Sequence, residues 1–166
     1  MSKTSARPAD EIETIVNNYG DMLFRICLLL LGNPNDAEDA IQETMLTYLQ
    51  KAPLFRDAEH QKAWLITVAT NKSKDILRFR SRHPVLPEEY TPDSLSHFTK
   101  DTTDSDILDA LMTLPEKYRL VLILYYVEEY SMTDIAKIIG RTTSAVKMRL
   151  QKGRKLLSET YQKEYL

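Results

Sequence analysis

Lysine and arginine side chains occupy one face of a predicted helix near the C-terminal end of this 166-residue chain. The segment 131–157, SMTDIAKIIGRTTSAVKMRLQKGRKLL, has the spacing of a helix-turn-helix, with Gly140 at the turn and Thr142 able to cap the second helix. The inner face of that second helix repeats every three or four residues and consists of Val146, Leu150, Gly153 and Leu157. The outer face carries cations without acids, which suits the major groove of duplex DNA.

A second cationic stripe is expected on a helix over residues 59–82. Asn71, Lys74, Arg78 and Arg82 are spaced three, four and four residues apart, so they share one side of the helix and can follow a phosphate backbone. Trp64 lies in a buried pattern, which favours a core position over base stacking. The apolar stripe expected to face the core consists of Leu65, Val68, Ala69, Lys72, Ile76 and Phe79.

Acidic residues gather on another predicted helix, which starts near Asn35 and ends before Pro53. Asp36, Glu38, Asp39 and Glu43 form a compact acidic surface that repels DNA and suits a protein partner. A metal-dependent nuclease using Asp36, Glu38 and Asp39 is an alternative. It needs converging ligands, whereas neighbouring acids on one exposed helix usually stay solvated. The sequence offers no nucleophile, histidine pair or phosphate-binding loop in support, so we expect no catalysis, cofactor or metal.

Composition sets limits on the class of protein. Only four glycines occur among many Leu, Ile, Lys and Glu residues, which favours an all-α fold. A net charge of -2 and a pI near 5.9 argue against a uniformly basic nucleic-acid coat. The single cysteine, Cys27, excludes an internal disulfide and fits a reducing cytosol. The longest apolar run, Ile26 to Leu31, is too short to cross a bilayer, so we expect a soluble, intracellular protein without membrane insertion.

The periodicity predicts two helical lobes joined by a linker. In the first lobe, a helix beginning after Asp10 precedes the two helices described above. Residues 83–104 are rich in proline, serine, threonine and acids and lack an apolar period, which is typical of a linker. Periodicity returns at Ser105, and a further helix is expected near Pro115 before the helix-turn-helix. The first helix is expected to bury Ile12, Ile15, Val16, Tyr19, Leu23, Ile26, Cys27 and Leu30.

Two lobes with separate basic faces imply two DNA contacts, and three stretches of the chain resemble a family that makes them. The stretches are DAEDAIQETMLTYL (36–49), HQKAWLITVATNKSKDILR (60–78) and LPEKYRLVLILYYVEEYS (114–131) followed by the helix-turn-helix. Their order and separation resemble the extracytoplasmic-function sigma factors, small members of the sigma-70 family of bacterial RNA polymerase subunits. The resemblance implies region 2 at residues 11–82, a linker at 83–104 and region 4 at 105–161.

The resemblance also implies a role for each matching residue. The acidic helix would bind the clamp of core RNA polymerase through Asp36, Asp39, Gln42 and Glu43. Region 2 would recognise and melt the minus-10 promoter element, with Asn71 lining a base pocket and Lys74, Arg78 and Arg82 holding phosphates.

Region 4 would read the minus-35 element in the major groove. Bases would be contacted by Lys147, Met148, Gln151 and Lys152, and phosphates by Arg141, Thr143, Arg149 and Arg154. Ala145, Met148 and Gly153 depart from the commoner family pattern, so the promoter sequence cannot be carried over.

The family further implies a monomeric, cytoplasmic transcription initiation factor of stress responses, which binds core polymerase and promoter DNA and is controlled by an anti-sigma factor. The alternative is a stand-alone helix-turn-helix regulator whose first lobe serves dimerisation or ligand binding. Such a lobe has no need for Asn71 and the aligned cations beside it.

Overall fold

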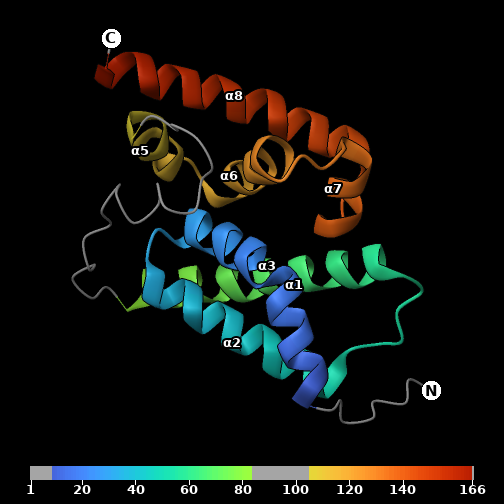
Figure 1. Ribbon diagram of the computed structural model, residues 1–166. Helices are drawn as coiled ribbons and strands as arrows, with labels where there is room; N and C mark the ends of the chain where they lie inside the picture. Colours follow the sequence, from blue (N-terminus) through green and yellow to red (C-terminus); the bar gives the residue numbers. More distant parts are fainter. Residues whose placement is uncertain (1–8, 84–104, 166) are drawn as a thin grey trace.

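The computed structural model describes residues 9–83 and 105–165, and every regular element within them is helical. Helices α1 (Ala9–Leu31), α2 (Pro34–Lys51) and α3 (Ala58–Arg82) form an N-lobe. The C-lobe contains α5 (Ser105–Thr113), α6 (Glu116–Leu122), the π-helical turn η1 (Ile123–Val127), α7 (Met132–Ile139) and α8 (Thr143–Tyr165) (Figure 1). The all-α prediction is confirmed. Most of the expected linker, residues 84–104, lies outside the described residues.

Capping side chains set where the N-lobe helices begin. The Asn33 side chain accepts a hydrogen bond of 3.1 Å from the backbone N–H of Asp36, and Pro34 fills the first helical turn. Asp57 accepts a bond of 2.7 Å from the N–H of His60 at the start of α3. Both helices therefore begin about one residue earlier than the apolar periodicity indicates.

The C-terminal half of α1 is buried on all sides. Leu28 and Leu29 are as inaccessible as Cys27 and Leu30, although they lie outside the predicted apolar stripe. The reason is that α2 and α3 cover one side of α1 while α6 and η1 of the C-lobe cover the other. In the N-terminal half of α1, Val16 is 45% exposed, so the prediction that it is buried is wrong.

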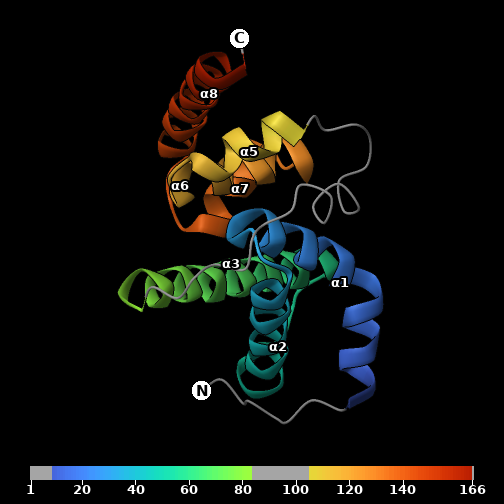
Figure 2. The same ribbon diagram turned by 90° about the vertical axis from the view of Figure 1, so that its left-hand side faces the viewer.

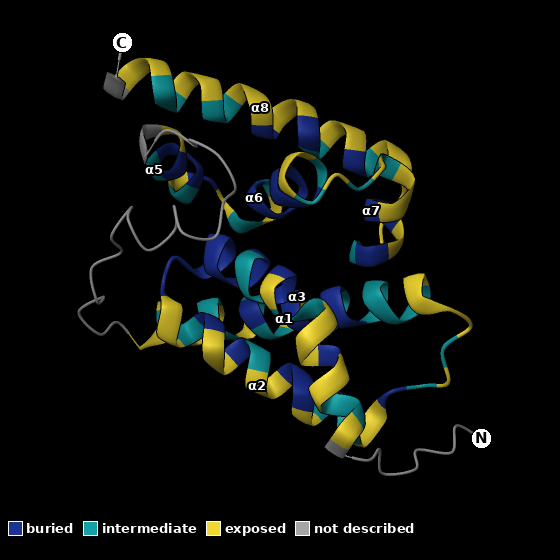
Figure 3. Ribbon diagram, in the orientation of Figure 1, coloured by how far each residue is buried: buried dark blue, intermediate teal, exposed yellow. Residues whose placement is uncertain are grey.

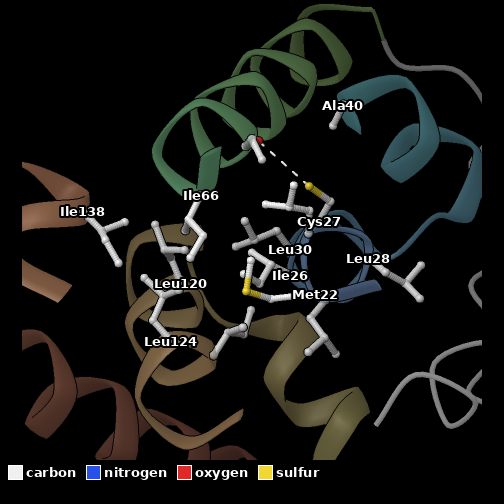
Figure 4. Packing of buried hydrophobic residues seen from close by; sticks show 14 of the residues in the cluster. Met22, Ile26, Cys27, Leu28, Leu30, Ala40, Ile66, Leu120, Leu124 and Ile138 are labelled. Atoms are coloured by element: carbon white, nitrogen blue, oxygen red, sulfur yellow. Dashed lines mark hydrogen bonds between the residues drawn. The ribbon is translucent and has the colours of Figure 1, made fainter. Parts of the chain in front are cut away.

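The two lobes share one hydrophobic core. Leu120 and Leu124 of the C-lobe lie beside Ile26 and Leu30 of α1, with Ile66 of α3 closing the cluster (Figure 4). In the same cluster, the Sγ of Cys27 lies 4.0 Å from the carbonyl oxygen of Ala69. Contacts of this kind fix how the lobes sit relative to each other, which the sequence pattern does not reveal.

One described helix, α1, is long and apolar enough to span a bilayer by length and composition, with a mean hydropathy of 1.2 over Asp10–Leu31. The apolar content has another explanation, because the side chains of its C-terminal half fill the core between the lobes. The core helix of a protein can be as long and as apolar as a helix that spans a membrane.

Candidate nucleic-acid interface

The helix-turn-helix has the predicted local geometry. Ser131 caps α7, and Gly140 ends it in the left-handed conformation with φ 67° and ψ 38°. The Thr142 hydroxyl accepts a hydrogen bond of 3.1 Å from the N–H of Ala145, which caps α8 as expected. Val146 and Leu150 are fully buried, and Gly153 lies against α6. The sequence therefore predicted both helices and the turn between them.

The outer face of α8 is exposed and points away from the other helices (Figure 3). Met148 is 70% exposed, which is unusual for a large apolar side chain and places it on the surface where a groove would lie. Arg149 is half-buried. Arg154 is exposed, but its guanidinium donates a hydrogen bond of 2.9 Å to the Tyr126 hydroxyl of η1. The predicted residues that are exposed are Arg141, Thr143, Lys147, Met148, Gln151, Lys152 and Arg154.

Helix α3 carries the second cationic face, and three of its four predicted residues point outward. Asn71, Arg78 and Arg82 are exposed, and Arg78 lies 3.5 Å from the Asp75 carboxylate one turn earlier. Lys74 is half-buried, and its Nζ lies 3.8 Å from Oε1 of Glu116 at the start of α6. Glu116 of the C-lobe therefore pairs with Lys74, one of the cations predicted to bind DNA.

The apolar stripe of α3 is shorter than predicted. Leu65 and Ala69 are fully buried, whereas Phe79 is 60% exposed because the C-terminal end of α3 projects beyond both lobes (Figure 2). Trp64 packs against the core, with its ring 5.8 Å from those of Tyr48 and Phe55. This contact explains why Trp64 is not a free stacking surface.

The acidic surface of α2 is only partly as predicted. Asp39, Gln42 and Glu43 are exposed and lie together on one face. Asp36 differs, because its carboxylate pairs with the guanidinium of Arg80 and its side chain is only 14% exposed.

Leu46 continues this exposed face of α2 and is 49% exposed. Sequence reasoning missed it because a leucine one turn beyond an acid cluster is usually buried. Protein interfaces commonly have apolar side chains at their centre and polar ones around them, and Leu46 lies among exposed polar residues. No group of three or more His, Cys, Asp or Glu side chains in the described part of the chain could hold a metal ion.

Polar contacts also join the lobes. The Arg25 guanidinium of α1 donates hydrogen bonds of 2.6 and 3.0 Å to the Glu128 carboxylate. The Thr67 hydroxyl of α3 donates to the carbonyl oxygen of Ile138 at 3.0 Å, and the Lys62 ammonium lies 5.2 Å from the centre of the Tyr130 ring.

Arg119 is the most buried of these polar side chains, at 6% exposure. Its guanidinium donates to the carbonyl oxygens of Met112 and Leu114 within the C-lobe and to that of Leu30 in α1. Burial lowers the pKa of Arg119, since the charged form is poorly solvated there. A lone arginine in an apolar run gives no sequence signal for this role.

Comparisons with known proteins agree with the two-lobe arrangement. Residues 15–83 match the family model described as Sigma-70 region 2, and residues 104–157 match that described as Sigma-70, region 4. RNA polymerase sigma factor SigV of Bacillus subtilis is 30% identical, with 92% of each chain covered. ECF RNA polymerase sigma factor SigL of Mycobacterium tuberculosis is 32% identical, with 98% of this chain and 95% of that protein covered.

Solved structures show the same fold. The sigma factor RpoE of Bartonella quintana, in complex with the anti-sigma factor NepR, is 22% identical. It superposes with a TM-score of 0.71, covering 94% of this chain and 99% of that one. CnrH, in complex with the cytosolic domain of CnrY, is 20% identical with a TM-score of 0.69, over 98% and 94% of the two chains. The matched regions and the relatives support a sigma factor and not the stand-alone regulator: the chain belongs to the extracytoplasmic-function group of sigma-70 family RNA polymerase sigma factors.

Proposed function

We propose that this sigma factor directs core RNA polymerase to specific promoters in the cytoplasm and helps to melt them, without catalytic chemistry of its own. Residues 11–82 would bind the polymerase and the minus-10 element, and residues 105–161 the minus-35 element, with 83–104 as the linker. The observation that carries the proposal is the presence of outward-facing cations on a different helix in each lobe, α3 and α8. The free protein would be a monomer, since most of the apolar side chains of both lobes are already buried in the shared core.

The α8 face supports base reading in a major groove. Lys147, Met148, Gln151 and Lys152 are exposed and close together on the helix, so their side chains can reach base edges. Arg141 and Thr143 lie at the N-terminal end of α8, where backbone N–H groups also favour a phosphate. Half-buried Arg149 and tethered Arg154 are weaker candidates for phosphate contacts.

The α3 face supports binding of a melted strand. The exposed Asn71 amide can donate to and accept from a base edge, and Arg78 and Arg82 lie on the same side, two and three turns further along. Lys74 would join them once it leaves Glu116.

The α2 face supports docking on the polymerase. We assign the contact to Asp39, Gln42 and Glu43 around the exposed Leu46, because an apolar anchor inside a polar rim is the usual composition of a protein interface. Asp36 would act indirectly, since its carboxylate already holds Arg80.

An anti-sigma factor is the remaining partner. The RpoE structure is a complex with the anti-sigma factor NepR, and the CnrH structure is a complex with the cytosolic domain of CnrY. In this chain, a groove of about 840 Å³ opens between the lobes, lined by Leu29 of α1, Leu111 of α5, Val127 of η1 and Leu157 of α8. An apolar helix of a regulator would fit there, with its apolar side chains against these lining residues.

The test of the polymerase contact is a binding titration with sigma-free core RNA polymerase. Leu46→Ala and Glu43→Ala should each weaken binding, Leu46→Ala by about tenfold if it anchors the interface. Glu159→Gln is the control, because Glu159 is an exposed acid on α8 and lies outside the α2 face. Wild-type protein that binds promoter DNA but not the core enzyme would contradict the proposal.

A further inference from the structure

The exposed Phe79 ring is stacked on the ring of His83 at the projecting end of α3. The ring centroids lie 4.2 Å apart and the planes are inclined by only 18°, so the His83 ring lies behind the Phe79 ring. We call this stacked pair the platform. The Nδ1 atom of His83 lies 3.1 Å from the carbonyl oxygen of Phe79, and the backbone N–H of His83 donates to that same oxygen at 2.9 Å. Both contacts of His83 are with the Phe79 carbonyl oxygen, and they hold the His83 ring behind the Phe79 ring.

Single exposed apolar side chains are common on protein surfaces, so exposure alone gives Phe79 no role. Its surroundings distinguish it. Arg78 and Arg82 flank it as exposed cations, and Arg80 follows it on the side where α2 begins. A ring face among arginines is the composition of surfaces that bind single-stranded nucleic acid, where bases stack and phosphates pair with cations.

The platform continues the face assigned to the minus-10 element. At 100° per residue, Asn71, Asp75, Arg78, Phe79 and Arg82 fall within an arc of about 100° on α3. Phe79 follows Asn71 by eight residues, which corresponds to about 12 Å along the helix axis. Since stacked nucleotides rise by 3.4 Å, that distance corresponds to about three or four nucleotides.

We infer that the outer face of the Phe79 ring stacks on an unpaired promoter base about three or four nucleotides from the base held at Asn71. The inference rests on the proposed function, because it takes promoter DNA as the ligand of α3. Phe79 would act as a second holding point for the melted strand, and His83 would position the ring from behind. Sequence recognition is not required, because every base has a flat face.

The test uses holoenzyme made from core polymerase and the full chain, on a promoter mapped with the wild-type protein. The promoter is prepared with a mismatched bubble and with 2-aminopurine placed at each bubble position in turn, since stacking quenches this base. Phe79→Leu keeps an apolar side chain but removes the ring face, and Phe79→Tyr restores it. Val16→Ala is the control, because Val16 is also an exposed apolar side chain but lies on α1.

In wild type we expect quenching at one position about three or four nucleotides from the position that Asn71→Ala affects. Phe79→Leu should remove that quenching and weaken binding to the bubble by about fivefold to hundredfold, whereas Phe79→Tyr should stay within about twofold of wild type. His83→Leu should weaken the same signal less than Phe79→Leu does. Affinity for core polymerase and the thermal midpoint should be unchanged, since both side chains are exposed.

If Phe79→Leu and His83→Leu both match wild type on a promoter that the wild-type holoenzyme opens, the inference is wrong. If Phe79→Tyr weakens binding and quenching as much as Phe79→Leu does, stacking is not the cause and the inference is also wrong. Failure of the proposed function looks different, since the wild-type holoenzyme would then open no promoter.

Discussion

Arg25 of α1 and Glu128 after η1 form a two-bond ion pair across the lobes, at 2.6 and 3.0 Å, although 103 residues separate them in the sequence. The Glu128 side chain is 7% exposed and that of Arg25 is 24% exposed. The pair raises the pKa of Arg25, first through its hydrogen bond to Glu128 and then through the charge of that carboxylate. The contact joins the N-lobe to the C-lobe at the edge of their shared core.

Arg25→Ala should lower the free energy of unfolding by about 2 kcal/mol, because it leaves the Glu128 carboxylate almost buried and without its partner. Urea unfolding of Arg25→Ala, Glu128→Gln and the double variant measures the coupling. We expect the double variant to lose less than the sum of the two single variants. Additive losses would show that the ion pair contributes nothing to holding the lobes together.

Glu116→Gln should increase affinity for DNA by up to about fivefold, because Lys74 is then released from the only carboxylate within 4.0 Å of it among the described residues. Fluorescence anisotropy with the holoenzyme and a bubble promoter measures the effect at two salt concentrations. Glu13→Gln makes the same change in net charge on an exposed part of α1 and serves as the control. Equal gains in both variants would attribute the effect to net charge alone.

Substituting alanine at two glycines should give different results. Gly140 has φ 67° and free space around its Cα, so Gly140→Ala should cost about 1–2 kcal/mol through backbone strain alone. At Gly153 an added Cβ would meet Leu122 at 3.3 Å, which offsets the helix propensity gain of about 1 kcal/mol. We expect Gly153→Ala to change stability by less than Gly140→Ala does. A larger loss of stability for Gly153→Ala than for Gly140→Ala would show that Leu122 of α6 cannot move away from the added Cβ.

The Cys27 thiol should be unreactive in the folded protein. Burial raises its pKa to about 11 from 9.0, partly offset by a hydrogen bond with Ser73. Because the thiol stays protonated longer in the folded chain, its contribution to stability is complete below about pH 9 and is lost as the pH rises towards 11. Reaction with a disulfide reagent at pH 8 should therefore be slow and should accelerate with urea. Rapid labelling of the native protein would contradict the burial of Cys27.

Lys147 and Arg141 should respond differently to promoter sequence. Lys147→Ala should cost about 1–3 kcal/mol on the cognate minus-35 element and little on a scrambled one if it reads a base. Arg141→Ala should weaken binding to both sequences and lower the salt dependence by about one charge if it meets phosphate. Footprinting of the holoenzyme over a range of salt concentrations separates the two. If the two variants behave identically, both side chains contact the phosphate backbone of the DNA.

The sequence predicted the elements that depend on local signals. Gly140 and Thr142 placed the turn between α7 and α8 because backbone conformation and capping act over a few residues. The buried positions Val146 and Leu150 followed from helical periodicity alone. Most of the exposed residues predicted on α3 and α8 followed for the same reason, although Lys74 and Arg149 are half-buried.

Features that depend on contacts between distant elements were not predictable. Leu29 is buried because the C-lobe covers the side of α1 that periodicity assigned to solvent. Asp36 is paired because Arg80, on another helix, lies beside the start of α2. Phe79 was assigned to the core because its spacing fits the apolar stripe of α3. The C-terminal end of α3, however, projects beyond the helices that would cover it.

The most direct test of the central claim is transcription from a library of genomic fragments by sigma-free core RNA polymerase with the purified protein added. The account predicts discrete start sites that share two sequence elements. Asn71→Ala should impair initiation by preventing melting, and Lys147→Ala by weakening recognition of the upstream element. No initiation above core polymerase alone, together with sequence-specific DNA binding by the isolated protein, would contradict it.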